Sequence, residues 1–221
     1  MNFDFDLAVN SFPVLLVGAL VTIKITAISV ALGVVIGLVV GVARISQVKP
    51  LRLLAMAYID FLRGTPLLVQ IFLIYFALPV VSGQRVDPFF AAITACSINS
   101  GAYVAEIFRS GIQSIDKGQM EAGRSLGMTW LQTMWHIILP QAVKRVIPQI
   151  GNEFIALLKD SSLVSVIGFE ELTRSGQLII ARTYGSLEIW PCVAIIYLVM
   201  TLSISQLVAY LERRFRTDDK H

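Results

Sequence analysis

Two acidic residues stand out in an apolar part of the sequence, Glu153 and Asp160. They are seven positions apart, so a helix that turns about 100° per residue places them nearly in register on one side. Ionisable groups at membrane depth are costly and generally face the interior of a helix bundle. Two carboxylates on one stripe predict a binding site for a cationic guest, such as an amino acid with an α-ammonium group and a basic side chain.

Each of these acids also has a structural alternative, because buried acids are usually paired. Glu153 would pair with an Arg or Lys on a neighbouring helix, and Asp160 would cap a turn at Ser161 and Ser162. The sequence leaves both interpretations open for both residues.

A second polar face lies on the apolar segment around residue 100. Asn99, Tyr103 and Glu106 occupy positions i, i+4 and i+7, which share one face of a helix. Asn99 and the adjacent Ser100 supply hydrogen-bond donors and acceptors that suit a polar ligand. The predicted substrate-binding residues are therefore Glu153, Asp160, Asn99, Ser100, Tyr103 and Gln70, the last as an amide that lines the path.

Other charged residues near the predicted membrane surface are assigned structural roles. Glu106 lies three residues before Arg109, a spacing that favours an ion pair within one helix. Asp60 and Arg63 have the same spacing and are predicted to pair in the same way.

The sequence lacks the residue patterns of nucleotide hydrolysis, nucleophilic catalysis and metal binding. A chain that hydrolyses nucleotides needs a phosphate loop of the form G-x-x-x-x-G-K-[ST], which does not occur here. The two histidines, His136 and His221, accompany no nucleophile. Cys96 and Cys192 lie in apolar stretches without the spacing of a metal site. We expect no catalytic residue, metal or cofactor bound by this chain.

The composition indicates a membrane protein. Hydrophobic residues make up 56% of the 221 residues and charged residues only 15%, whereas about a quarter of a soluble domain is charged. The net charge of +3 comes without a run of five or six basic residues, so nothing suggests a nucleic-acid partner.

The apolar segments predict an all-α, polytopic membrane protein with a single domain over residues 1–221. A spanning helix needs about 20 mostly apolar residues. Residues 51–63 are expected to form an amphipathic lead-in to the second span. In the first span, Gly33, Gly37 and Gly41 form a stripe that allows another helix to approach closely. We predict five spans, at about 12–43, 64–81, 89–110, 146–169 and 187–211.

The basic residues predict the orientation, because cytoplasmic loops of membrane proteins carry an excess of Lys and Arg. With the N-terminus outside and the C-terminus in the cytoplasm, the inner side receives 13 of the 18 basic residues. These are Arg44, Lys49, Arg52, Arg63, Arg109, Lys117, Arg124, Lys144, Arg145, Arg213, Arg214, Arg216 and Lys220. This orientation places residues 112–144 in the cytoplasm.

The segment EAGRSLGMTWLQTMWHIILP, residues 121–140, is a polar insert in that cytoplasmic region. Gly123 and Gly127 predict two short helices around a turn, and Pro140 predicts the end of the second helix. An exposed apolar patch on such a hairpin marks a partner surface, although a re-entrant hairpin without a partner fits the periodicity equally well. The apolar residues are Met120, Leu126, Met128, Trp130 and Trp135.

This segment resembles the EAA loop of ABC-importer permeases. The pattern of that loop is Glu-Ala-Ala, three residues, Gly, nine residues and Ile-x-Leu-Pro. Residues 121–123, Gly127 and residues 137–140 reproduce this spacing, with Gly123 in place of the second alanine. The resemblance implies that one surface docks on an ATPase subunit and transmits its closure, formed by Glu121, Ala122, Gly123, Leu126 and Gly127.

Further stretches are similar to the polar amino-acid branch of these permeases, so that the resemblance covers nearly the whole chain. They are RGTPLLVQIFLIYF (63–76), AYVAEIFRSGIQSI (102–115), LPQA (139–142), LKDSSLVSVIG (158–168) and LERR (211–214). The family implies a type I importer permease core of five or six helices in the bacterial inner membrane. It also implies a dimer with an identical or related permease, two ATPase subunits that bind ATP and Mg²⁺, and an extracytoplasmic amino-acid-binding protein.

A different class of transporter is the alternative. An ion-coupled secondary transporter or channel would use Glu153 or Asp160 as a proton or cation relay. Five spans provide few helices for such a protein, and the protruding hairpin would have no task in it.

Overall fold

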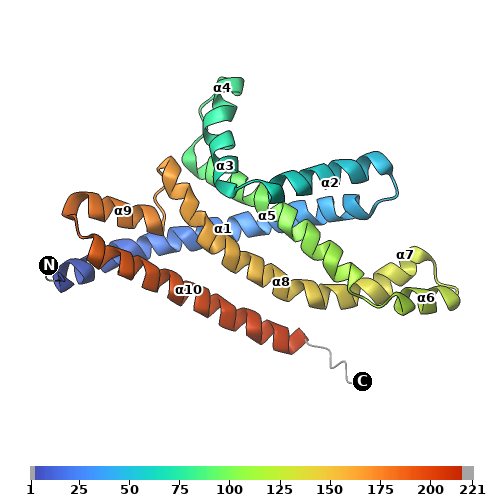
Figure 1. Ribbon diagram of the computed structural model, residues 1–221. Helices are drawn as coiled ribbons and strands as arrows, with labels where there is room; N and C mark the ends of the chain where they lie inside the picture. Colours follow the sequence, from blue (N-terminus) through green and yellow to red (C-terminus); the bar gives the residue numbers. More distant parts are fainter. Residues whose placement is uncertain (1–2, 216–221) are drawn as a thin grey trace.

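The computed structural model describes residues 3–215, which form helices joined by short connections without a strand (Figure 1). Arg216, Lys220 and His221 lie outside the described residues. The elements are α1 (Phe5–Ile45), α2 (Lys49–Gly64), α3 (Leu67–Phe72), the π-helical turn η1 (Leu73–Ala77), α4 (Leu78–Ser82), α5 (Pro88–Gln113), α6 (Lys117–Ser125), α7 (Trp130–Thr133), the π-helical turn η2 (Met134–Ile138), α8 (Leu139–Asp160), the 3₁₀ helix η3 (Ser161–Ile167), α9 (Leu172–Thr183) and α10 (Ser186–Phe215). The predicted all-α class is confirmed.

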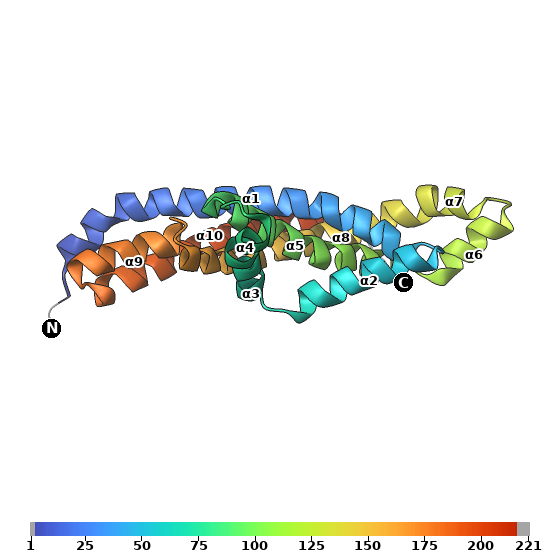
Figure 2. The ribbon, with the colours of Figure 1, turned by 90° about the horizontal axis from the view of Figure 1, so that it is seen from above.

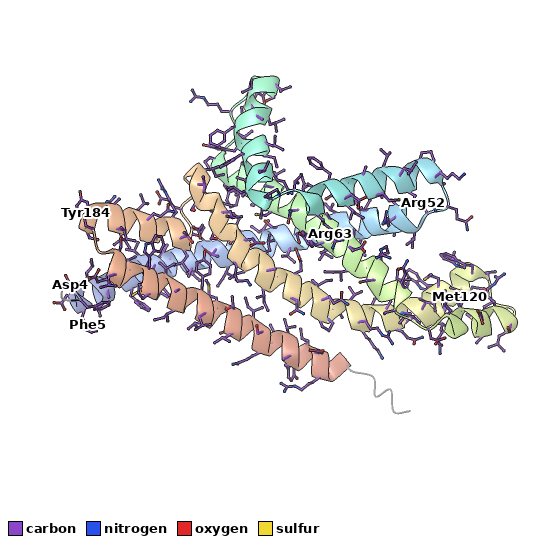
Figure 3. The ribbon with its side chains drawn as sticks, in the orientation of Figure 1. Asp4, Phe5, Arg52, Arg63, Met120 and Tyr184 are labelled. Carbon is purple, nitrogen blue, oxygen red and sulfur yellow. The ribbon has the colours of Figure 1, made fainter. Side chains whose placement is uncertain are left out.

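The molecule is elongated and its two ends differ. Helix α1 runs along most of the bundle, with α9 and the start of α10 beside its N-terminal end (Figures 1 and 2). The hairpin of α6 and α7 projects at the opposite end. Figure 3 shows the same polarity, with Asp4 and Tyr184 at one end and Arg52 and Met120 at the other.

The glycine stripe of α1 is the surface on which α5 packs. A Cβ atom on Gly37 would lie 2.5 Å from Val104 Cγ1, and one on Gly33 would lie 2.9 Å from Ser100 Cβ. Larger side chains at these positions would therefore separate the two helices. The predicted role of the small residues in close helix approach is confirmed.

Two apolar clusters fill the bundle, and α1 contributes to both. The first includes Ile25, Ile71 and Leu157, and the second includes Leu15 and Leu172. Large apolar side chains also remain exposed along the outer faces of α1 and α10, among them Leu20, Val39, Ile195, Leu198 and Leu202. Such faces fit a lipid environment.

Within residues 3–215, only some of the five predicted spans are helices long and apolar enough to cross a membrane. Helices α1 and α10 meet this criterion, and α2 together with Leu67–Ser82 meets it as a pair bent by 106°. The bend separates the amphipathic α2 from the following segment, as the sequence predicts. Helix α5 buries polar residues such as Ser97, Asn99 and Ser100, and α8 carries polar and charged residues along its partly exposed faces. These residues lower the mean hydropathy of both helices, and their assignment as spans stays a prediction.

The helix that follows the hairpin does not end at Pro140, so that prediction is wrong. Residues 130–160 form one continuous helix, in which the Leu139 N–H donates to the Met134 carbonyl, five residues back. This π-helical turn comes directly before Pro140, which has no N–H and whose ring would clash in a regular helix. The same arrangement precedes Pro79, where Leu78 donates to Leu73.

Two further boundaries differ from the predicted spans. The fourth predicted span, 146–169, is the second part of α8 followed by η3, because the helix starts at Leu139 and tightens after Asp160. Helix α9 lies in the stretch that was expected to connect the last two spans. It buries Leu172, Ser175 and Gly176 on one face and has 12 residues, which is too short to cross a bilayer.

Candidate functional site

The Glu153 carboxyl group lies in an open depression between α5 and α8. The depression has a volume of about 330 Å³ and is lined by Ile107, Gln149, Asn152, Glu153 and Ala156. Within residues 3–215, no Lys or Arg side chain lies at ion-pairing distance from Glu153. The alternative prediction, an ion pair of Glu153 with a neighbouring helix, is therefore wrong for the described residues. The depression therefore offers an acid without a cationic partner, flanked by two amides.

The polar residues of α5 lie in different surroundings. The buried Ser100 hydroxyl faces the Glu153 carboxyl group across the contact between α5 and α8. Asn99 instead points to α3, where its Nδ2 donates to Gln70 Oε1 at 3.0 Å. Of these two neighbours in sequence, only Ser100 is brought toward Glu153.

Gln70 holds the bend between α2 and α3. Its Nε2 donates to the Leu62 carbonyl at 2.9 Å and to the Thr65 carbonyl at 3.1 Å, while its oxygen accepts from Asn99. Because the side chain is 4% exposed and uses both ends of its amide, it fastens the bend to α5. The structure places Gln70 at this joint and does not bring it to the depression at Glu153.

Tyr103 and Glu106 belong to a cluster that contains two arginines. Glu106 forms an ion pair with Arg109, as predicted, and the Arg109 Nε lies 2.9 Å from Glu106 Oε2. Arg63 approaches Glu106 to 4.0 Å and lies over the Tyr103 ring at 5.3 Å from its centroid. The predicted pair of Asp60 with Arg63 is wrong, because Arg63 turns to α5 instead.

Asp160 lies apart from the depression at Glu153. It is exposed at the C-terminal end of α8 and does not line that depression. Seven residues of helix correspond to about 10 Å along the axis. The predicted cap is also wrong, because the Asp160 side chain accepts no hydrogen bond at the start of η3. The two acids thus share a helix side but not one cavity.

The predicted hairpin is formed by α6 and α7 around a turn at Gly127. The φ of Gly127 is 82°, a left-handed conformation that glycine adopts without strain. Gly123 is buried against α7, since a Cβ atom there would lie 2.5 Å from Thr133 Cγ2. Thr129 and Gln132 form a capping box at the start of α7. The hairpin is therefore closed by its own contacts.

The outer surface of this hairpin carries large apolar side chains. Leu126 is 83% exposed, Leu131 67%, Trp135 66% and Trp130 51%. Met120 behaves differently from the prediction, because it packs with Ile115 and Ile138 at the base of the hairpin. Glu121 and Ala122 are exposed beside the apolar residues. The arrangement fits a docking surface for another protein.

Glu171 is fully buried, and no motif or spacing in the sequence pointed to it. Its carboxylate accepts from the Arg174 backbone N–H at 2.8 Å and from the Tyr197 hydroxyl at 2.9 Å. The Thr22 hydroxyl lies 3.4 Å away. Glu171 thus caps α9 and joins it to α1 and α10. Among the described residues, no group of His, Cys, Asp and Glu side chains could hold a metal.

Three curated relatives match nearly the whole chain. The glutamine transport system permease protein GlnP of Escherichia coli is 45% identical over 98% of this chain and 99% of its own length. The arginine transport system permease protein ArtQ of Bacillus subtilis is 39% identical over 99% of this chain and 100% of its own length. The L-cystine transport system permease protein TcyB of Bacillus subtilis is 42% identical over 95% of this chain and 90% of its own length.

Solved structures share the fold. A crystal structure of an amino acid ABC transporter with histidines is 47% identical, with a TM-score of 0.94 over 97% of this chain and 100% of that chain. An inward-facing MetNI methionine ABC transporter has a TM-score of 0.75 over 92% of this chain and 97% of that chain at 22% identity, and supports the fold alone.

The family match covers most of the chain, residues 33–217, and corresponds to the binding-protein-dependent transport system inner membrane component. The match includes the hairpin, the depression at Glu153 and the bend at Gln70. The curated relatives over the full length are permease subunits of transport systems. This chain therefore belongs to the family of binding-protein-dependent transport system inner membrane components, as a permease subunit and not as an enzyme.

Proposed function

We propose that this chain forms the translocation path of an ATP-driven importer of polar amino acids, with a preference for basic ones. The observation that carries the proposal is the separation of two surfaces on one continuous helix. Glu153 lines an open depression between α5 and α8 with no Lys or Arg of residues 3–215 at ion-pairing distance, and the apolar hairpin projects from one end. The first surface suits a cationic solute, and the second suits a protein that drives the movement.

The amino-acid class is supported by the relatives, which transport glutamine, arginine and cystine by their names. The preference for basic side chains rests on Glu153, because a carboxylate binds guanidinium and ammonium groups through charge-assisted hydrogen bonds. Ser100, Gln149 and Asn152 add neutral polar groups around the carboxylate. These groups suit the carboxylate and ammonium ends that all amino acids share.

The proposed assembly contains this permease with an identical or related permease, two ATPase subunits and an extracytoplasmic binding protein. ATP and Mg²⁺ bind to the ATPase subunits. The complex lies in the bacterial inner membrane with the N-terminus of this chain outside and the hairpin in the cytoplasm. The distribution of basic residues supports this orientation.

In the proposed cycle, the ATPase subunits close on ATP and draw the hairpins of the two permeases together. Each hairpin continues into α8 without a break, so its movement displaces the helix that carries Glu153. The bundle then opens outward and the amino acid leaves the binding protein for the depression. Hydrolysis returns the permease to the inward-open state, which is alternating access by rigid-body movement.

Reconstitution into proteoliposomes tests the function. The complex with its ATPase and a set of candidate amino-acid-binding proteins should transport labelled arginine, histidine or lysine across the vesicle membrane. ATP is supplied on the side that the ATPase subunits face, and the binding protein on the opposite side. Uptake should require both ATP and one binding protein. Uptake of glutamine in clear preference to the basic amino acids would contradict the substrate assignment and leave the importer assignment intact.

The same vesicles separate the importer from an ion-coupled transporter. The chain without the ATPase should show no uptake under a proton or sodium gradient. Uptake driven by an ion gradient alone would contradict the importer assignment and favour a relay at Glu153 or Asp160.

A further inference from the structure

Three arginines from three different helices gather around Glu106. Arg109 follows it on α5, Arg63 comes from the end of α2, and Arg44 comes from the end of α1. All three guanidinium groups lie within electrostatic range of the Glu106 carboxylate. No other acidic side chain of residues 3–215 lies at ion-pairing distance from these arginines. Because arginine stays protonated in proteins, one negative charge stands against three positive charges.

The Glu106 carboxylate is already occupied by Arg109. Glu106 Oε2 accepts from Arg109 Nε at 2.9 Å, and Oε1 accepts from Arg109 Nη2. This is the bidentate arrangement in which one guanidinium group uses both carboxylate oxygens. Arg63 Nη1 lies 4.0 Å from Oε1, which is too far for a hydrogen bond. Two of the three cations therefore lack a carboxylate of their own.

Arg44 shows most clearly that an acceptor is missing. Its Nη1 atom is buried and has no hydrogen-bond partner among residues 3–215. Leaving a buried charged donor unsatisfied costs free energy, so such groups normally meet protein, water or a ligand. A guanidinium group presents its donors in a flat fork that matches the oxygens of a phosphate group. The unsatisfied atom beside an excess of positive charge indicates an anion from outside the chain.

The cluster lies where the apolar outer surface of α1 ends. Val39 and Val42 are 68% and 66% exposed and lead up to Arg44, after which the chain becomes polar and exposed at Lys49. Phe61, two residues before Arg63, is 56% exposed on α2. Basic pockets between membrane helices bind lipid headgroups on the cytoplasmic side of membranes. An apolar surface that ends at arginines fits a phospholipid, which carries acyl chains next to its phosphate.

We infer that Arg44, Arg63 and Arg109 form a binding site for the phosphate group of an anionic phospholipid. The inference uses the membrane placement of α1 and α5 and the proposed orientation, but not the proposed substrate. Free phosphate offers the same oxygens without acyl chains for the apolar surface beside the arginines. A transported amino acid also carries a carboxylate, and Arg63 lies within electrostatic range of Glu153. None of the three arginines lines the depression at Glu153, which favours the lipid.

Lipid binding to the complete transporter tests this site. The complex is purified in detergent without added lipid and titrated with phosphatidylglycerol, phosphatidylcholine or inorganic phosphate, and native mass spectrometry gives the Kd of each. The wild type should bind phosphatidylglycerol about tenfold more tightly than phosphatidylcholine. Arg63→Gln should raise the Kd for phosphatidylglycerol about fivefold, and Arg44→Gln combined with Arg63→Gln about 25-fold, because each arginine near the membrane surface contributes a similar increment.

Arg52→Gln is the matched control. It removes the same charge from an exposed position of α2 at the hairpin end of the molecule (Figure 3). Its Kd for phosphatidylglycerol should change less than about twofold, because water and salt screen an exposed charge. If the double variant does not fold, Arg63→Gln alone decides, since this side chain is 41% exposed and its loss leaves the packing intact.

Three results would overturn the inference. The first is equal binding of phosphatidylglycerol by Arg63→Gln and the wild type. The second is inorganic phosphate that binds as tightly as phosphatidylglycerol, which would make the site one for free phosphate. The third is displacement of the lipid by excess labelled arginine, which would assign the arginines to the substrate carboxylate. A wild type that binds the lipid but imports no amino acid would contradict the proposed function and leave the lipid site standing.

Discussion

The hairpin and the depression at Glu153 lie on the same continuous helix but are built in opposite ways. The hairpin satisfies its polar groups through local contacts and exposes apolar side chains such as Leu126 and Trp135. The depression exposes an acid without a counter-ion and is built from two helices that are distant in sequence. The proposed docking surface is therefore held by contacts within one segment of the chain, whereas the proposed transport site keeps polar groups that the fold does not use.

The largest effect is expected when the apolar surface of the hairpin receives a charge. Leu126→Asp should weaken the affinity for the ATPase subunit about 100-fold, or about 3 kcal/mol, because a buried contact would have to hold an unpaired carboxylate. The Kd measured with purified ATPase in detergent checks this. Gln119→Asp adds the same charge to an exposed position of α6 and should have little effect. An unchanged Kd for Leu126→Asp would remove the docking role from this surface.

A smaller effect is expected from the turn of the hairpin. Gly127→Val should destabilise the turn by about 2 kcal/mol, because valine is unfavourable at a positive φ. No atom lies within 4 Å of the position for a Cβ, so the effect comes from the backbone and not from a clash. ATP hydrolysed per amino acid imported should rise. Gly64→Val, at a position with equally open space and no positive φ, is the control. Unchanged coupling in Gly127→Val would contradict the role of a rigid hairpin.

The depression is tested by removing its charge. Glu153→Gln should lower arginine uptake about tenfold, or about 1.4 kcal/mol, while glutamine uptake changes much less. Competition between the two labelled amino acids in the same vesicles measures the ratio. Glu170→Gln, an exposed acid outside the depression, should behave like the wild type. Equal uptake of arginine by Glu153→Gln and the wild type would exclude Glu153 as the residue that recognises the cation.

The smallest effect is expected at the second acid. Asp160→Asn should change arginine uptake less than about threefold, because an exposed carboxylate outside the depression interacts weakly with a guest screened by water. The same competition assay measures it. A loss as large as that of Glu153→Gln would show that the two acids act together, as their spacing in the sequence predicts.

The hairpin could be predicted from the sequence because its interactions are local. Gly127 lies four residues after Gly123, and the capping residues Thr129 and Gln132 are three residues apart. The pair of Glu106 and Arg109 was predictable for the same reason. Helix geometry alone decides which of these residues meet.

The rest of the site depends on contacts between helices, which local spacing does not reveal. Asn99 and Gln70 are 29 positions apart, and the bend that brings them together has no separate signature. Glu171 meets Thr22 across 149 positions. Sequence reasoning therefore identified polar residues on α5 and α8 but could not decide which were used by the fold.

The π-helical turn before Pro140 has a mechanical consequence. From Trp130 to Glu153 the helix covers about 35 Å at 1.5 Å per residue, so a small tilt applied at the tryptophans becomes a displacement of several ångströms at the carboxylate. A helix that stopped at Pro140 would absorb that tilt in a loose joint. By widening one turn before the proline instead of ending there, the chain keeps one continuous helix between the exposed tryptophans and Glu153, which is the connection that the proposed cycle requires.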